Sequence, residues 1–172
     1  GDGTVTFTPT ANFNGAASFT YKVKDIAGVA SANSATVTVT VVGVNDVPVA
    51  VNDSGTVTED TAKVFTAANL VGNDTDADLP YGDVLSVQSV SGAANGTVVL
   101  NADGTVTFTP AANYNGAASF TYKVKDAAGV TSANSATVTL TVTGVNDPPT
   151  AVNDTGIVTE DTAKVFTAAS LV

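Results

Sequence analysis

Thr36-Val37-Thr38-Val39-Thr40-Val41 is the stretch that decides the fold class. Its strict alternation places every valine on one face of an extended chain and every threonine on the other, because successive side chains of a strand point to opposite faces. The same period recurs in residues 105–109 and 118–125, where apolar and aromatic side chains alternate with threonine and lysine. β-Branched and aromatic residues favour strands. The sequence therefore predicts several strands, each with one face in a core and one in solvent.

Turn signals separate these strands. Asp103-Gly104 and Asn95-Gly96 are hairpin-type dipeptides, and Asn115-Gly116 marks a further turn. The expected strands between residues 47 and 147 are 49–58, 62–70, 84–91, 97–100, 105–109, 118–125 and 135–143. No helix is expected, and 61–70 is the most ambiguous segment. Seven short strands in about 100 residues predict an all-β, seven-stranded sandwich of the cadherin-like or immunoglobulin-like kind.

The sequence repeats itself. Gly3–Pro9 returns as Gly104–Pro110, an offset of 101 residues, and Asn45-Asp46 returns as Asn146-Asp147 at the same offset. A fixed period of this kind indicates tandem structural units, and the proline after each Asn-Asp pair marks the boundary between them. We expect residues 1–46 to be the C-terminal part of a preceding repeat, 47–147 to be one complete 101-residue repeat, and 148–172 to be the N-terminal part of the next. The chain is expected to be a segment of a longer array.

Composition narrows the function classes. Sixteen acidic residues oppose six basic ones, for a net charge of −10, and histidine and cysteine are absent. This charge argues against binding nucleic acid or an anionic membrane, which need a basic surface. No apolar run reaches the roughly 18 residues of a membrane-spanning helix, so no membrane insertion is expected. We do not expect an enzyme, although paired carboxylates leave glycoside hydrolysis open as an alternative.

The acidic residues gather in a few loops. If the strands alternate in direction, loop 72–83 and Asp126 lie at the end of the repeat where the N-terminal linker arrives, and Glu59-Asp60 lies at the opposite end. Calcium prefers six to eight hard oxygen ligands in a flexible shell, and such loops can supply them at each junction between repeats. The expected metal ligands are Asn45, Asp46, Glu59, Asp60, Asp74, Asp76, Asp78, Asp126, Asn146 and Asp147. The alternative is that these residues only stabilise turns, which is the preferred interpretation for Asn113 and Asn115.

The combined motifs resemble a known family. Residues 73–80, Asn-Asp-Thr-Asp-Ala-Asp-Leu-Pro, look like the Asp-x-Asp loop of cadherin repeats. Asn45-Asp46 before proline resembles the cadherin-type linker, and Thr58-Glu59-Asp60-Thr61 resembles the acidic site after the first strand of those domains. The run 101–122 is similar to the bacterial cadherin-like or immunoglobulin-like tandem repeats of giant secreted adhesins of the repeats-in-toxin type. The linker Asn45-Asp46-Val47-Pro48 lacks a second Asn-Asp pair, which leaves the number of ions per junction open.

This resemblance implies a secreted or cell-surface location, calcium at the junctions, and a role in adhesion or biofilm formation. We therefore expect a calcium-stabilised spacer of a large bacterial adhesin or fibre, whose partners are the neighbouring repeats. Two alternatives stay open. Outward threonine rows, such as Thr36, Thr38 and Thr40, could bind glycans or ice, although ordinary strand propensity explains them better. The two ends could also pair with identical chains in a strand-complemented fibre.

Overall fold

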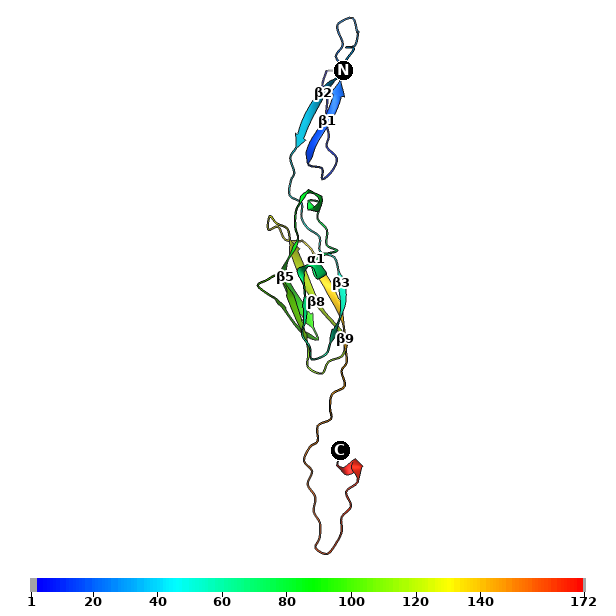
Figure 1. Ribbon diagram of the computed structural model, residues 1–172, viewed down its shortest axis with the longest axis vertical. Coiled ribbons are helices and arrows are strands. Elements are labelled where there is room, and N and C mark those ends of the chain that lie inside the picture. Colours follow the sequence, from blue (N-terminus) through cyan, green and yellow to red (C-terminus); the bar gives the residue numbers. More distant parts are fainter. Residues whose placement is uncertain (1–2, 172) are drawn as a thin grey trace.

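The computed structural model describes residues 3–171. The chain is elongated, with three parts along its long axis (Figure 1). A two-stranded hairpin, β1 (Gly15–Tyr21) and β2 (Ala35–Val41), lies at the N-terminal end. A body of two sheets lies in the middle. An extended segment at the other end finishes with the 3-10 turn η2 (Ala168–Ser170).

The body is a sandwich of seven strands. Its four-stranded sheet has the order β3 (Asp53–Thr58), β9 (Ala136–Thr143), β8 (Gly116–Lys125) and β5 (Ser86–Ala94). Its three-stranded sheet has the order β4 (Lys63–Phe65), β7 (Val106–Pro110) and β6 (Gly96–Leu100). β3 is parallel to β9 and the other pairs are antiparallel, as expected for strands that alternate in direction along the chain. The predicted number of strands is confirmed.

The core lies between the two sheets. Phe120, Tyr122 and Val124 of β8 are buried and the residues between them are half-exposed, so the period-2 prediction is confirmed. The Phe120 ring stacks on Phe108 with centroids 5.9 Å apart and meets the edge of Phe65 at 5.8 Å. Aromatic packing across the two sheets therefore forms the centre of the body.

A short helix corrects the sequence prediction. The expected strand 62–70 is β4 followed by α1 (Ala67–Val71), so the expectation of no helix was wrong. The backbone amide and the hydroxyl of Thr66 both donate to the Asn69 side chain, at 3.0 and 2.7 Å, which closes the first turn. Leu70 anchors the helix in the core. No helix among the described residues, α1 and the two 3-10 turns included, has the length and apolar character needed to cross a bilayer.

The dipeptide Asn95-Gly96 also behaves differently from the prediction. It joins β5 to β6, which belong to different sheets, so it forms a corner rather than a hairpin turn. Asn95 has φ 58°, and its side-chain amide donates to the Ala117 carbonyl at 2.8 Å and to the Tyr114 hydroxyl at 2.9 Å. These long-range bonds hold the crossing strand against β8. Asp103-Gly104, by contrast, lies in a true hairpin between β6 and β7.

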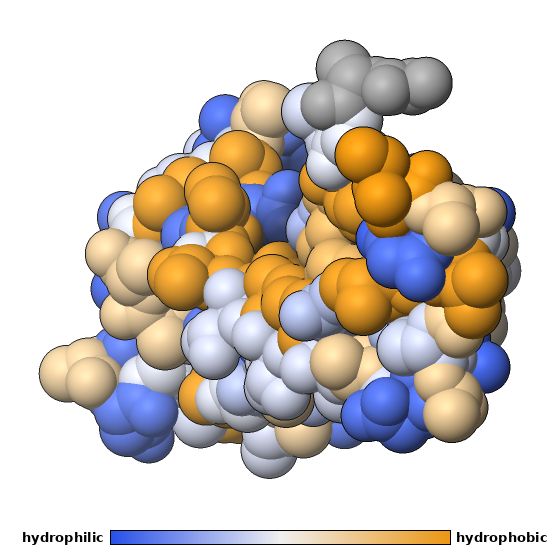
Figure 2. Space-filling model, turned by 90° about the horizontal axis from the view of Figure 1, so that it is seen from above, coloured by the Kyte–Doolittle hydropathy of each residue, from blue (hydrophilic) through white to orange (hydrophobic). Residues whose placement is uncertain are grey.

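The flanking segments expose side chains that the body buries. Tyr21 is 44% exposed, whereas its repeat equivalent Tyr122 is 1% exposed. Val5 and Val106 differ in the same way, at 70% and 0%. The end-on view in Figure 2 shows apolar surface next to polar surface on this N-terminal face. Burial here depends on the presence of a second sheet, not on the local sequence.

The Tyr122 hydroxyl is a polar centre at the edge of the core. It lies within hydrogen-bond distance of four acceptors: the Val51 carbonyl (2.9 Å), Asp53 Oδ2 (2.8 Å), the Leu70 carbonyl (2.8 Å) and Asp74 Oδ1 (3.1 Å). A phenol carries one proton, so it donates to one of these acceptors at a time. Burial raises the pKa of both Asp53 and Asp74, and burial together with these two carboxylates raises the pKa of Tyr122. A proton on Asp53 or Asp74, which both pKa shifts favour, would give this centre a second donor.

A core substitution tests the packing. Leu140→Ala removes a fully buried side chain of β9 and should lower the free energy of unfolding by about 2–5 kcal/mol. Val39→Ala changes the equivalent position of β2, which is only half-buried, and should cost far less. Chemical denaturation of the two variants measures the difference. An equal loss of unfolding free energy in the two variants would contradict the location of the core.

The pH dependence of stability tests the Tyr122 centre. The folded chain holds a proton at Asp53 more tightly than the unfolded chain, whose ordinary pKa is 3.8, so this contribution is full below that value and is lost as pH rises through the raised folded pKa. Asp53→Asn should therefore flatten the decline in melting temperature as pH rises above 3.8 in metal-free buffer, since an amide can donate without titrating.

Asp154→Asn is the matched control, because Asp154 is the repeat equivalent of Asp53 and is exposed in the C-terminal segment. It should leave the pH profile unchanged. A profile of the Asp53→Asn variant that follows the wild type would exclude a role for this carboxyl.

Candidate metal centres

Three separate segments converge where the N-terminal linker meets the body, and we call this group the N-terminal cluster. Carboxylate oxygens of Asp76, Asp83 and Asp126 lie within 4.8 Å of one another. The linker joins them, because the Asp46 amide donates to Asp78 Oδ2 at 2.8 Å and the Asn45 side chain donates to Asp126 Oδ2 at 2.8 Å. The segments come from the linker, from loop 72–83 and from the residue that follows β8.

Backbone amides orient each carboxylate of the N-terminal cluster. Asp76 Oδ1 accepts from the Asp78 amide at 2.8 Å, and Asp83 Oδ1 accepts from the amides of Val84 and Ala127 at 2.8 and 3.0 Å. The second oxygens of Asp76 and Asp83 are buried and have no hydrogen-bond partner. A buried acceptor without a donor is costly, and buried carboxylates in proteins are normally paired or bound to a metal. One oxygen of each side chain is therefore fixed and the other is free to bind.

Asp126 is the most buried member of the cluster, with 3% of its surface exposed. The hydrogen bond from the Asn45 side chain, helped by backbone amides of the following turn such as Val130 at 2.7 Å, lowers the pKa of Asp126. Asp126 is thus held as a carboxylate beside Asp76 and Asp83. A cleft of about 180 Å³ lies next to the cluster, between the hairpin and the body, and Asn12, Asn14, Asp46 and Asp78 are among the residues that line it.

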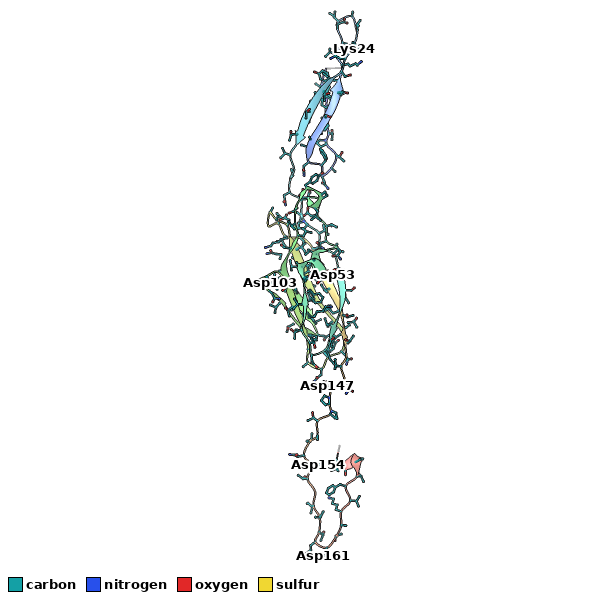
Figure 3. The ribbon with its side chains drawn as sticks, viewed as in Figure 1. Lys24, Asp53, Asp103, Asp147, Asp154 and Asp161 are labelled. Carbon is teal, nitrogen blue, oxygen red and sulfur yellow. The ribbon has the colours of Figure 1, made fainter. Side chains whose placement is uncertain are left out.

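A second group of acids, the C-terminal cluster, lies at the opposite end of the body. Carboxylate oxygens of Glu59, Asp60 and Asp147 lie within 4.8 Å of one another, and Asp147 marks the exit of the chain in Figure 3. Glu59 is 4% exposed and accepts from the Val145 amide, which fixes the start of the outgoing linker. Asp60 Oδ1 accepts from the Asn113 amide at 2.9 Å. Asp60 itself has φ 57°, a strained backbone that these bonds hold in place.

The structure brings together most of the residues proposed from sequence. Asn45, Asp46, Asp76, Asp78 and Asp126 meet at one end of the body. Glu59, Asp60 and Asp147 meet at the other, and Asn146 adjoins them with its side chain on the Asp147 carbonyl at 3.3 Å. The alternating direction of the strands was therefore enough to predict which acidic loops lie at each end of the body.

Two residues differ from the sequence-based set. Asp74 lies outside the group of three clustered carboxylates: its Oδ1 accepts from the Val51 amide at 2.6 Å and contacts the Tyr122 hydroxyl, whereas its Oδ2 is buried without a partner, like those of Asp76 and Asp83. Asp83 was not proposed, yet it lies in the N-terminal cluster and bridges loop 72–83 to the segment after β8. Its place in the acidic loop was the available signal. The amide of Asn113 orients Asp60, so this residue supports the C-terminal cluster through its backbone.

The clustered groups at both ends are carboxylates, and Asn45 and Asn146 contact their neighbours through their side-chain N–H groups. Carboxylates are hard oxygen donors that suit calcium, which accepts irregular shells of six to eight oxygens from carboxylates, carbonyls and water. The orphaned oxygens of Asp76 and Asp83 fit a bound cation, which would supply the partner that they lack. A metal there would also offset the repulsion among the three clustered carboxylates.

One family model matches most of the chain. No curated protein matches the chain. Similar solved structures include two endo-fucoidan hydrolases from glycoside hydrolase family 107, at 19% and 18% identity and TM-scores of 0.40 and 0.31. The alignments cover 80% and 78% of this chain but only 20% and 23% of those proteins. A family model described as a cadherin-like domain matches residues 1–41 and 44–143. The chain therefore belongs to the cadherin-like domain family.

Proposed function

We propose that this chain is a calcium-stabilised spacer in a large bacterial extracellular adhesin or fibre, and that its partners are the neighbouring repeats of the same protein. The observation that carries the proposal is the N-terminal cluster. Loop 72–83 and the end of β8 contribute carboxylates that lie close together, and the Asn45 side chain of the linker donates to one of them. Two carboxylate oxygens of this cluster are buried without a partner. A cation at this place would bind three carboxylates of the body, and the linker is joined to the same loop and strand end by hydrogen bonds from the Asn45 side chain and the Asp46 amide.

The internal repeat indicates that the two clusters are halves of one site. Asn45-Asp46 and Asn146-Asp147 occupy the same position in the repeat. The first pair contacts the N-terminal cluster of the repeat that follows it, and the second pair adjoins Glu59 and Asp60 of the repeat that precedes it. Between two complete repeats, one linker pair would therefore lie between a Glu59-Asp60 group and an Asp76-Asp83-Asp126 group. Such a junction offers enough oxygen donors for calcium.

The mechanism is mechanical. Without a cation, the clustered carboxylates repel one another and the linker is held by a few hydrogen bonds. With calcium bound, the same carboxylates attract a common charge, which restricts bending between consecutive domains. Ligand that binds only the folded form stabilises it by mass action, about 2.7 kcal/mol at a free concentration of about 100 times Kd. A series of such units would hold a distal part of the protein away from the cell.

The location and the absence of catalysis are part of this proposal. The resemblance to tandem repeats of giant secreted adhesins supports the cell surface or the extracellular space. The clustered groups are carboxylates at the ends of a sandwich, which suits cation binding better than bond cleavage. The fucoidan-hydrolysing activity belongs to proteins of which this chain matches about a fifth.

Calcium removal tests the proposal. We expect calcium to raise the melting temperature of the chain and to narrow the range of shapes seen by small-angle X-ray scattering, because the ion joins the hairpin to the body. Chelator should reverse both effects. Calorimetric titration, melting and scattering on the same sample check this. An unchanged melting temperature and scattering profile at millimolar calcium would refute the stiffening role.

Asp126→Asn and Asp25→Asn form a matched pair of variants. Asp25 is the repeat equivalent of Asp126 and makes the same local turn bond, from the Val29 amide at 2.8 Å, but it is exposed in the hairpin. Asp126→Asn should weaken calcium binding about tenfold or more, since a charged ligand is lost. Asp25→Asn should leave the affinity at the wild-type value. Equal affinities of all three proteins would place the ion elsewhere.

A further inference from the structure

Tyr122 lies where the three segments of the N-terminal cluster are fastened to the body. Its hydroxyl contacts the carbonyl of Val51, at the end of the linker, and the carbonyl of Leu70, in α1 just before loop 72–83. It also contacts Asp74 Oδ1, inside that loop. Tyr122 itself stands on β8, four residues before Asp126. One phenol thus lies between the linker, the acidic loop and the strand end, and it donates its single proton to one of these acceptors at a time.

Asp74 extends this connection. Its Oδ1 accepts from the Val51 amide at 2.6 Å as well as contacting the phenol, so the carboxylate pins the loop to the linker. The next residue, Thr75, continues the attachment through two backbone bonds with Val49, at 2.8 and 3.1 Å. Asp76 follows directly, with its side chain in the cluster. The position of the ligand-bearing loop relative to the linker is therefore set at Tyr122 and Asp74.

We infer that Tyr122 is a positioning residue for the calcium site, acting through Asp74 and the linker at Val51 rather than by contact with the ion. The inference rests on the proposed function, because it concerns the same junction. Tyr122 holds the linker ligands and the loop ligands in register before an ion binds. A phenylalanine in its place would keep the aromatic packing and lose every one of these polar contacts.

The internal repeat supplies an unusually close control. Tyr21 stands at the equivalent position of β1 and is 44% exposed. Among the described residues its hydroxyl has no hydrogen bond to a loop, and the hairpin contains no counterpart of residues 70–83. Tyr21→Phe therefore removes the same atom from the same sequence context without touching the site. Leu140→Ala serves as a second control, because it destabilises the core on β9 without altering the contacts of Tyr122.

The experiment measures calcium affinity by titration calorimetry, with calcium chloride as the probe, in the wild type, Tyr122→Phe, Tyr21→Phe and Leu140→Ala. We expect Tyr122→Phe to weaken binding about tenfold or more, as when outer partners of metal ligands are removed. The other two variants should keep the wild-type affinity, although Leu140→Ala melts at a lower temperature. Unchanged affinity in Tyr122→Phe, or an equal loss in Leu140→Ala, would overturn the positioning role.

Hydrogen exchange of the metal-free proteins separates this inference from the proposed function. Tyr122→Phe should speed exchange of the Val49, Val51 and Thr75 amides, which form the linker-to-loop bonds, whereas Tyr21→Phe and Leu140→Ala should not do so selectively. If the wild type binds no calcium, the proposed function fails, and selective exchange still supports Tyr122 as the organiser of the junction. Exchange at these amides equal to that of the wild type would overturn the inference whatever calcium does.

Discussion

Buried carboxylate oxygens without donors are the constraint around which the N-terminal junction is built. Asp76 and Asp83 each have one oxygen held by backbone amides and a second oxygen that is buried and unpaired. Such groups are rare in protein cores, because an unpaired buried acceptor loses its hydrogen bonds to water and gains none within the protein. Their persistence at a point where three chain segments meet is understandable if a cation completes the site. The loops, the linker and the centre at Tyr122 all serve to hold these oxygens in place.

The alternating sequence predicts the sheets well, and for a physical reason. In a strand that covers a core, every second side chain is buried. Apolar residues at alternate positions, such as Phe120 and Val138, therefore reveal a strand in the sequence. Helix α1 was not predicted, because its five residues are too few to show the helical period of hydrophobic residues. It depends on the cap between Thr66 and Asn69 and on the burial of Leu70, and the second of these is a tertiary effect.

The site could be located from sequence, but its members could not be fully sorted. Strand direction alone divides the acids between two ends, which is enough to pair Glu59 with Asp147 and Asp76 with Asp126. The sequence does not reveal that Asp74 turns toward Tyr122 whereas Asp83 turns toward the junction. Both are aspartates in one acidic loop, and their difference arises from the bridge between Val49 and Thr75 and from η1 (Leu79–Tyr81), which reverses the chain. Side-chain direction in an irregular loop is fixed by such distant contacts.

The way in which the carboxylates are oriented argues that the junction is prepared for a cation rather than for a basic side chain. The donors that contact the cluster are backbone amides and, in one case, the side-chain amide of Asn45, so all of them are neutral. A neutral donor orients an oxygen without cancelling the charge that attracts the ion. A lysine in the same place would satisfy the carboxylates and close the site. The arrangement thus keeps its negative charge, and under the proposed function this charge is what would bind the cation that stiffens the junction.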